Sequence, residues 1–271
     1  MEIVDFLHYA FIRRALITGS FIALVCSLLG VLLVLRRFSL IGDGLAHVTF
    51  GSVAIGLLLK QHPVYVSIPI VMLSSLGILK LTEKAKLYGD AAIGIVSSIG
   101  IAGGILIASI AGGFNVDLFS YLFGNILSIS KAEVFTAIVL SLVVLLIISL
   151  FYKEHFSTTF DEEFAKVSGI NTKKINSILV LLTGITVVLA MRVVGIMLTS
   201  ALLILPAVTA LQIAKSFKNT MAISSVIAMS SVIIGIYISF VMNLPTGATI
   251  VMTNFIFFIA AFLYRNIFPK D

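Results

Sequence analysis

The chain has 271 residues, of which 60% are hydrophobic and only 11% are charged. Soluble domains are about 45–50% apolar and about 25% charged, so this composition excludes an ordinary soluble enzyme. It also excludes a disordered chain, and the single cysteine, Cys26, excludes a disulfide scaffold. The composition predicts an all-α polytopic membrane protein in which residues 1–271 form one transmembrane domain.

Long apolar runs bounded by charges, prolines or glycines predict about nine spanning helices, with about eight to ten as the range. The predicted spans are 15–35, 40–59, 63–80, 91–111, 132–152, 175–191, 195–214, 220–242 and 246–264. Met1–Arg14 is expected to be an interfacial lead-in to the first span rather than a cleaved signal, because no A-x-A-like site follows that span.

Two connections are expected to contain structure of their own. Residues 112–131 are half apolar, which predicts an external, partly helical loop. Residues 153–174 form the longest polar stretch and are expected to be cytoplasmic. There, Thr158 or Thr159 could cap a short helix over Asp161–Val167, and Gly169 would end it.

Lysine and arginine predict the orientation of the chain. With 153–174 in the cytoplasm, alternating spans put most basic residues inside, which predicts an external N-terminus and a cytoplasmic C-terminus in a bacterial cell membrane. The inside set is Arg36, Arg37, Lys80, Lys84, Lys86, Lys153, Lys166, Lys173, Lys174, Lys215, Lys218, Arg265 and Lys270, and the outside set is Arg13, Arg14, Lys60, Lys131 and Arg192. The net charge of +6 is spread over separate loops, so it does not predict nucleic-acid binding.

One pair of ionisable residues falls inside a predicted span. Asp43 and His47 are four residues apart, so on a helix they lie on one face. A carboxylate and an imidazole suit manganese and zinc, which makes the pair a candidate for half of a metal site. Gly42 and Gly44 flank the aspartate and predict a local departure from helical geometry that exposes the backbone to the pathway. The alternative is structural: Asp43 caps the helix and His47 hydrogen-bonds to it.

Other residues carry weaker predictions. Pro206 lies in the seventh span and predicts a broken helix beside a translocation pathway. Asp90 precedes the fourth span and is expected to be its N-cap, or else a residue behind the metal ligands. Gly100 and Gly104 have the spacing of a close helix contact. Glu133 is external and is a candidate for contact with a docking partner.

No G-x-x-x-x-G-K-[ST] phosphate loop occurs in the sequence, so ATP-driven work would need a separate ATPase chain. The chain is therefore expected to be a transport subunit and not an enzyme. An intramembrane hydrolase that uses Asp43 and His47 is a weaker alternative, since no nucleophile motif accompanies them.

Four stretches of the sequence resemble the membrane permease subunits of bacterial ABC importers for zinc and manganese. They are VLRRFSLIGDGLAHVTFGSVAIG (34–56), DAAIGIVSSIGIAGG (90–104), FDEEFAKVSGIN (160–171) and VGIMLTSALLILPAVTA (194–210), with support from LPTGATIVM at 244–252. The resemblance extends over almost the whole chain.

The resemblance implies a fold of the vitamin B12 permease-like type and a homodimer with the pathway between the two copies. Its implied partners are two cytoplasmic ATP-binding subunits, an external metal-binding receptor and membrane lipid. It implies that Asp43 and His47 contact the transported metal and that no cofactor is permanently bound. It also implies that 160–171 docks on the ATPase, with a family pattern at Phe160, Asp161, Glu163, Ala165 and Gly169.

These observations favour an ATP-driven importer of zinc, manganese or iron that works by alternating access. A proton-coupled secondary metal carrier is an alternative that uses the Asp43–His47 pair but gives the helical loop at 160–171 no role. A permease for a metal chelate such as a siderophore is a further alternative.

Overall fold

The computed structural model describes residues 8–84, 88–113, 116–124 and 129–267. Within these ranges no strand is assigned, and nine helices are long and apolar enough to cross a membrane, as the sequence predicted. The long helices are α2 (Ala10–Leu35), α3 (Ile41–Leu58), α4 (Pro63–Lys84), α5 (Gly89–Ile110), α7 (Lys131–Leu150), α10 (Thr172–Ala190), α11 (Thr199–Ile213), α12 (Phe217–Met242) and α13 (Thr246–Ile267). The short 3₁₀ helix η2 (Ile196–Leu198) directly precedes α11 and completes its spanning length.

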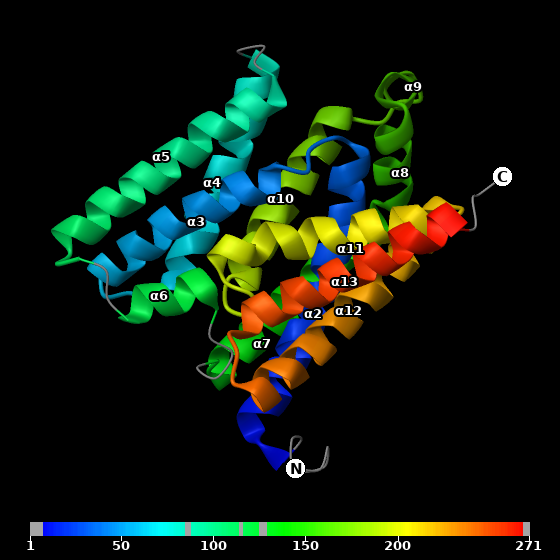
Figure 1. Cartoon of the computed structure of the whole chain (residues 1–271). Helices are drawn as coiled ribbons and strands as arrows, with labels where there is room; N and C mark the ends of the chain where they lie inside the picture. Colours follow the sequence, from blue (N-terminus) through cyan, green and yellow to red (C-terminus); the bar gives the residue numbers. More distant parts are fainter. Residues whose placement is uncertain (1–7, 85–87, 114–115, 125–128, 268–271) are drawn as a thin grey trace.

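In the described part of the two connections that were expected to be structured, there are three short helices. Helix α6 (Val116–Phe123) lies in the predicted external loop, and α8 (Tyr152–Phe160) and α9 (Glu162–Val167) lie in the predicted cytoplasmic loop. Helices α8 and α9 lie towards the same end of the bundle as the last turns of α13, whereas α6 and the start of α2 lie towards the other end (Figure 1). The two loops therefore occupy opposite ends of the bundle.

Helix α2 begins earlier than the sequence predicted, at Ala10, so Arg13 and Arg14 belong to the helix and not to a lead-in. Arg13 is exposed, and the Arg14 side chain reaches along the surface so that its Nη1 donates to the carbonyl of Ile129 at 3.0 Å. Long basic side chains can extend their charge away from an apolar helix in this way. The helix can therefore begin before Arg13 and Arg14 and include both charged residues.

Helices α3 and α5 pack against each other at backbone distance. A Cβ added to Gly51 would lie 2.7 Å from the carbonyl oxygen of Gly100, and one added to Gly100 would lie 2.8 Å from the Cα of Val48. Added to Gly104, it would lie 3.0 Å from the Cα of Gly51. Only residues without side chains permit such an approach, which confirms the predicted close contact at Gly100 and Gly104.

The break among the later spans lies between α10 and α11, at Met191–Gly195, and not at Pro206. Gly195 has φ +94°, and a Cβ there would lie 2.5 Å from the backbone of Phe123. Pro206 is inside α11, which stays helical through it, so the predicted break at Pro206 is wrong. Proline removes one backbone hydrogen bond, but Pro206 and its neighbour Ala207 are buried in the bundle, and that packing maintains the helix.

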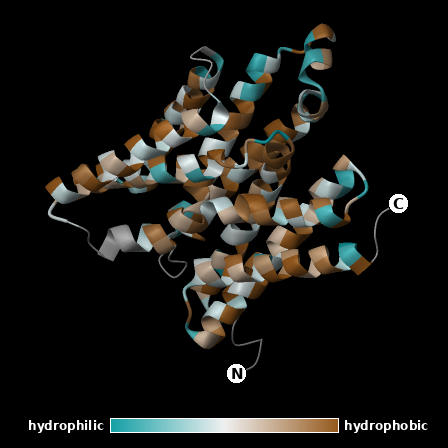
Figure 2. Ribbon diagram, turned by 45° about the horizontal axis from the view of Figure 1, so that its top comes forward, coloured by the Kyte–Doolittle hydropathy of each residue, from teal (hydrophilic) through white to brown (hydrophobic). Residues whose placement is uncertain are grey.

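The outside of the bundle suits a bilayer. Hydrophobic residues colour most of the helix bodies, while many of the hydrophilic residues gather at helix ends and connections (Figure 2). Large apolar side chains such as Ile99 on α5, Leu146 on α7 and Phe262 on α13 are exposed. Exposed apolar area of this extent marks contact with lipid or with another protein.

Candidate functional site

Asp43 lies in the first turn of α3, close to the connection from α2. The N-cap of α3 is Leu40 and no side chain caps it, so Asp43 does not take the capping role of the structural alternative. Its carboxylate is still favoured there by the helix dipole. The side chain is half-buried, and the hydroxyl of Ser200, in the first turn of α11, lies 3.5 Å from Asp43 Oδ1 as a long hydrogen-bond donor.

His47 follows one turn later on α3 and is also half-buried. Its Nδ1 lies 2.6 Å from Oγ of Ser97 on α5. In the tautomer whose Nδ1–H donates to Ser97, the lone pair of Nε2 is available to a metal ion. A hydrogen bond at the second ring nitrogen is the usual arrangement for a metal-binding histidine, because it fixes both tautomer and orientation.

Three helices thus form the surroundings of the pair: α3 provides Asp43 and His47, α5 provides Ser97, and α11 provides Ser200. The sequence analysis missed both serines. The available signal was that each lies in a stretch that carries the family resemblance, 90–104 and 194–210. Among the described residues of one chain, no third histidine, cysteine, aspartate or glutamate lies close enough to Asp43 and His47 to complete a metal site with them.

The glycines beside Asp43 do not unwind the helix. Helix α3 is regular from Ile41 onward, so the departure from helical geometry predicted at Gly42 and Gly44 is wrong. Both positions serve close packing instead. An added Cβ at Gly42 would lie 2.7 Å from Leu203 Cδ1, and at Gly44 it would lie 2.5 Å from Ile93 Cγ2.

Asp90 is the second residue of α5 and not its N-cap, which is Tyr88. The predicted capping role is therefore wrong, although a carboxylate in the first turn still complements the helix dipole. The Asp90 side chain is exposed, whereas Asp43 and His47 are half-buried.

The predicted cytoplasmic helix consists of two helices, α8 and α9, with Asp161 between them. Asp161 caps α9, since its Oδ1 accepts from the amide of Phe164 at 2.8 Å. Thr158 and Thr159 lie within α8 and donate to backbone carbonyls of the preceding turn, so neither is the predicted cap. Gly169 ends α9 with φ +84°, as predicted, and the amide of the next residue bonds back to Ala165.

Of the five residues in the family pattern, four are exposed in this structure, namely Phe160, Asp161, Glu163 and Gly169. Ala165 is 0% exposed and packs inside the chain, so its side chain is not at the surface in this conformation. Glu163 is exposed, and so are the apolar side chains of Phe164 (64%) and Val167 (89%). The sequence analysis missed Phe164 and Val167, which form the apolar surface of α9.

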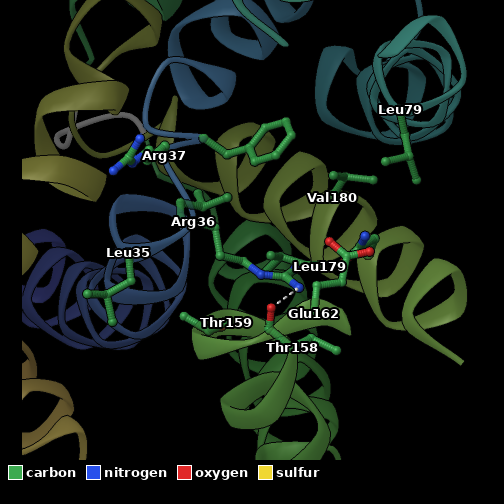
Figure 3. Close-up of a pocket in the computed structure, with 12 residues that line it drawn as sticks. Leu35, Arg36, Arg37, Leu79, Thr158, Thr159, Glu162, Leu179 and Val180 are labelled. Atoms are coloured by element: carbon green, nitrogen blue, oxygen red, sulfur yellow. Dashed lines mark hydrogen bonds between the residues drawn. The ribbon is translucent and has the colours of Figure 1, made fainter. Parts of the chain in front are cut away.

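Arg36 connects the α8–α9 pair to the turn that precedes α3. It follows the last residue of α2, and its Nη2 donates to the carbonyl of Thr158 on α8 at 3.1 Å (Figure 3). Arg36, Thr158 and Glu162 of α9 all line one cavity. Burial lowers the pKa of Arg36 and the negative charge of Glu162 opposes that shift, so the guanidinium and this carboxylate attract one another.

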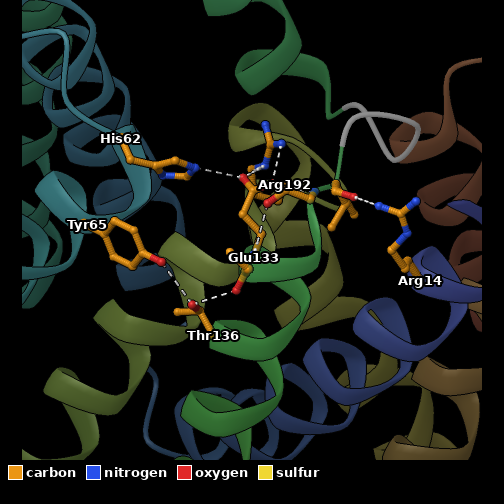
Figure 4. A network of polar contacts seen from close by, with 9 residues as sticks. Arg14, His62, Tyr65, Glu133, Thr136 and Arg192 are labelled. Atoms are coloured by element: carbon orange, nitrogen blue, oxygen red, sulfur yellow. Dashed lines mark hydrogen bonds and ion pairs between the residues drawn. The ribbon is translucent and has the colours of Figure 1, made fainter.

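A second polar cluster lies near the opposite end of the bundle. The Glu133 carboxylate at the start of α7 pairs with Arg192, and His62 approaches the same carboxylate at 3.5 Å (Figure 4). Glu133 is only 8% exposed, so its predicted availability to a docking partner is wrong in this conformation. Glu133 also belongs to a capping box with Ser130, which fixes the first turn of α7.

Comparison with known proteins supports the expected family. Residues 8–265 match the ABC 3 transport family. The chain is 34% identical over 265 residues to the manganese transport system membrane protein MntC of Listeria monocytogenes, which covers 98% of this chain and 93% of that protein. It is 29% identical over 252 residues to the high-affinity zinc uptake system membrane protein ZnuB of Haemophilus influenzae. That alignment covers 93% of this chain and 97% of ZnuB. A chain of PsaBC from Streptococcus pneumoniae, solved in complex with Fab, matches with TM-score 0.87 and 31% identity over 98% of this chain and 99% of that one. The chain therefore belongs to the ABC 3 transport family and is a multi-pass membrane permease.

Proposed function

We propose that this chain is the permease subunit of an ATP-binding cassette importer that carries manganese or zinc into the cytoplasm. The observation that carries the proposal is the arrangement of Asp43 and His47 on one turn of α3, each beside a serine of a neighbouring helix. The names of the related manganese and zinc permeases support the same substrate class. A carboxylate oxygen and an imidazole nitrogen can take either ion.

The ligand count favours a homodimer. Asp43 and His47 are two ligands, whereas Zn²⁺ usually takes about four and Mn²⁺ about six. A second copy of the chain that faces the first would double the set, and water would complete the shell. Binding of this partial kind suits transport, because an ion held by a full cage would leave slowly.

The remaining partners follow from the cytoplasmic and external surfaces. The exposed apolar residues Phe164 and Val167 of α9, beside Glu163, suit a groove on a separate ATP-binding subunit. The opposite end of the bundle, where α6 lies, would receive the metal from an external binding protein. This assignment puts the N-terminus outside and the C-terminus in the cytoplasm, in agreement with the distribution of basic residues.

The test is metal uptake by the reconstituted complex of this chain and its ATPase in liposomes that contain ATP. Uptake of radioactive Mn²⁺ or Zn²⁺ should require ATP, and Asp43→Asn and His47→Gln should each reduce it to background without loss of assembly. Glu83→Gln is the matched control, since it neutralises an exposed carboxylate on α4 that has no expected part in the metal site. Uptake driven by a proton gradient without ATP would instead support the secondary carrier.

A further inference from the structure

The turn between α2 and α3 is short and tightly hydrogen-bonded. The amide of Arg37 donates to Val34, that of Phe38 donates to Leu33 at 2.9 Å, and that of Ile41 donates to Phe38. Arg37 adopts the left-handed conformation with φ 59°. A connection of this kind has little freedom of its own, so a displacement at its start moves the first turn of α3 with it.

Arg36 is the residue of this turn that contacts the α8–α9 pair. The guanidinium donates to the carbonyl of Thr158 at 3.1 Å and is attracted to Glu162, so it contacts α8 and faces α9 (Figure 3). It is half-buried beside a cavity of about 260 Å³ that Thr159 and Asn176 also line. Even a half-buried cation is costly without partners, so these contacts favour one position of the α8–α9 pair relative to the turn.

Helices α8 and α9 are directly connected, with no loop longer than one residue between them. The Asp161 cap joins the two helices, and the salt bridge between Lys166 and Glu162, 3.2 Å long, spans one turn of α9. On its other side, α8 packs the ring of Phe156 against Phe217 at the start of α12, with ring centroids 5.2 Å apart. A displacement of the α8–α9 pair can therefore reach α12 through Phe156 and Phe217, and the turn before α3 through Arg36.

We propose that Arg36 is a positioning residue that transmits displacement of the α8–α9 pair to the first turn of α3, and so to Asp43 and His47. The inference rests on the proposed function, because it assigns to one side chain the link between the ATPase-facing surface and the metal-binding pair. Asp43 lies seven residues after Arg36, in the first turn of the next helix, and no flexible linker lies between them.

Neighbouring residues offer matched variants for the test. Arg37 is adjacent and carries the same charge, but it is exposed. Arg36→Gln removes the charge and Arg37→Gln removes the same charge one residue away. Arg36→Lys keeps a cation that can donate one hydrogen bond to Thr158, although it lacks the planar guanidinium. Glu162→Gln weakens the attraction and leaves Arg36 in place.

The experiment measures ATP hydrolysis and Mn²⁺ transport in the same liposomes that hold the complete complex. Arg36→Gln should lower the metal transported per ATP by about tenfold, the factor expected for loss of one hydrogen bond to a charged group. Hydrolysis should persist, Arg36→Lys should restore most of the ratio, and Arg37→Gln should leave the ratio at the wild-type value.

Several outcomes would overturn the inference. One is an unchanged ratio in Arg36→Gln, and another is a ratio that falls as much in Arg37→Gln. If Arg36→Gln does not assemble, Glu162→Gln decides: an intermediate fall in the ratio supports the relay, and a wild-type ratio contradicts it. The proposed function is judged separately, since it fails if the wild-type complex shows no ATP-dependent transport or if Asp43→Asn transports normally.

Discussion

Arg192 Nε lies 2.7 Å from Glu133 Oε1, and Arg192 Nη2 donates to Glu133 Oε2 at 3.2 Å, so the two side chains pair through both carboxylate oxygens. Both are largely buried, at 8% exposure for Glu133 and 11% for Arg192. The guanidinium also lies over the ring of Tyr121 on α6, 4.8 Å from its centre. The ion pair joins the start of α7 to the interruption that follows α10 (Figure 4), and the contact with Tyr121 adds α6.

Glu133→Gln should destabilise the chain more than an ordinary surface substitution. The amide keeps the shape but removes the negative charge beside the buried guanidinium of Arg192, and loss of one partner of a buried pair costs about 3–5 kcal/mol when its charge is left uncompensated. The apparent melting temperature in detergent should fall clearly. Glu163→Gln, which neutralises an exposed carboxylate, is the control and should melt like the wild type. Equal melting of the two variants would show that the ion pair contributes little.

Ser97→Ala should weaken metal transport without disturbing the fold. The hydroxyl 2.6 Å from His47 Nδ1 orients the ring, and loss of such a partner behind a metal ligand costs about 10–100-fold in affinity. The concentration of Mn²⁺ for half-maximal uptake should rise accordingly. Ser98→Ala, one residue later and exposed, should leave this concentration unchanged. The same rise in both variants would exclude a specific role for Ser97.

Gly100→Ala should disrupt the contact between α3 and α5, whereas Gly103→Ala should be tolerated. A Cβ at Gly100 meets the backbone of Val48 at 2.8 Å, and a backbone cannot move aside as a flexible side chain can. At Gly103 nothing lies within 4 Å of the added Cβ. Overpacking costs about 1–3 kcal/mol or more. Melting curves of the two variants in detergent test the difference, and similar curves would contradict the packing described for α3 and α5.

The sequence predicted the spans well because each depends on a local property, a long apolar run between polar boundaries. It also predicted Gly169 as the end of α9, since a positive φ after a helix is a local demand that glycine meets. The spacing of Gly100 and Gly104 predicted a close helix contact, but which side chains meet across the helices could not be predicted. Ser97 and Ser200 come beside His47 and Asp43 only when α5 and α11 pack against α3.

The wrong predictions at Pro206 and at the glycines beside Asp43 have the same origin. Pro206 carries a local signal for a broken helix, but the burial around it maintains α11. Gly42 and Gly44 carry a local signal for flexibility, but the side chains of Leu203 and Ile93 occupy the space that their own side chains would need. In each case tertiary packing determined the outcome, and the sequence alone did not contain it.

His155 on α8 should make the stability of the cytoplasmic helices depend on pH. Its side chain is 1% exposed, and burial lowers its pKa from 6.5 to about 4, with a further lowering by the positive charge of Arg36 and an opposing effect of Glu154. Because the folded chain binds this proton less tightly than the unfolded chain, the stabilisation is complete above about pH 6.5 and is lost as pH falls towards about 4.

His155→Phe keeps a ring in this position and removes the titrating group. Melting temperatures in detergent should therefore fall less steeply between about pH 6.5 and about pH 4 in this variant than in the wild type. The corresponding difference in the free energy of unfolding is on the order of 3 kcal/mol at the acid end. His8→Gln, which removes an exposed imidazole, should follow the wild-type curve. Because the wild type and both variants retain all acidic residues, the titration of carboxylates is common to the three curves. An identical pH dependence in His155→Phe and the wild type would show that protonation of His155 does not destabilise the folded chain.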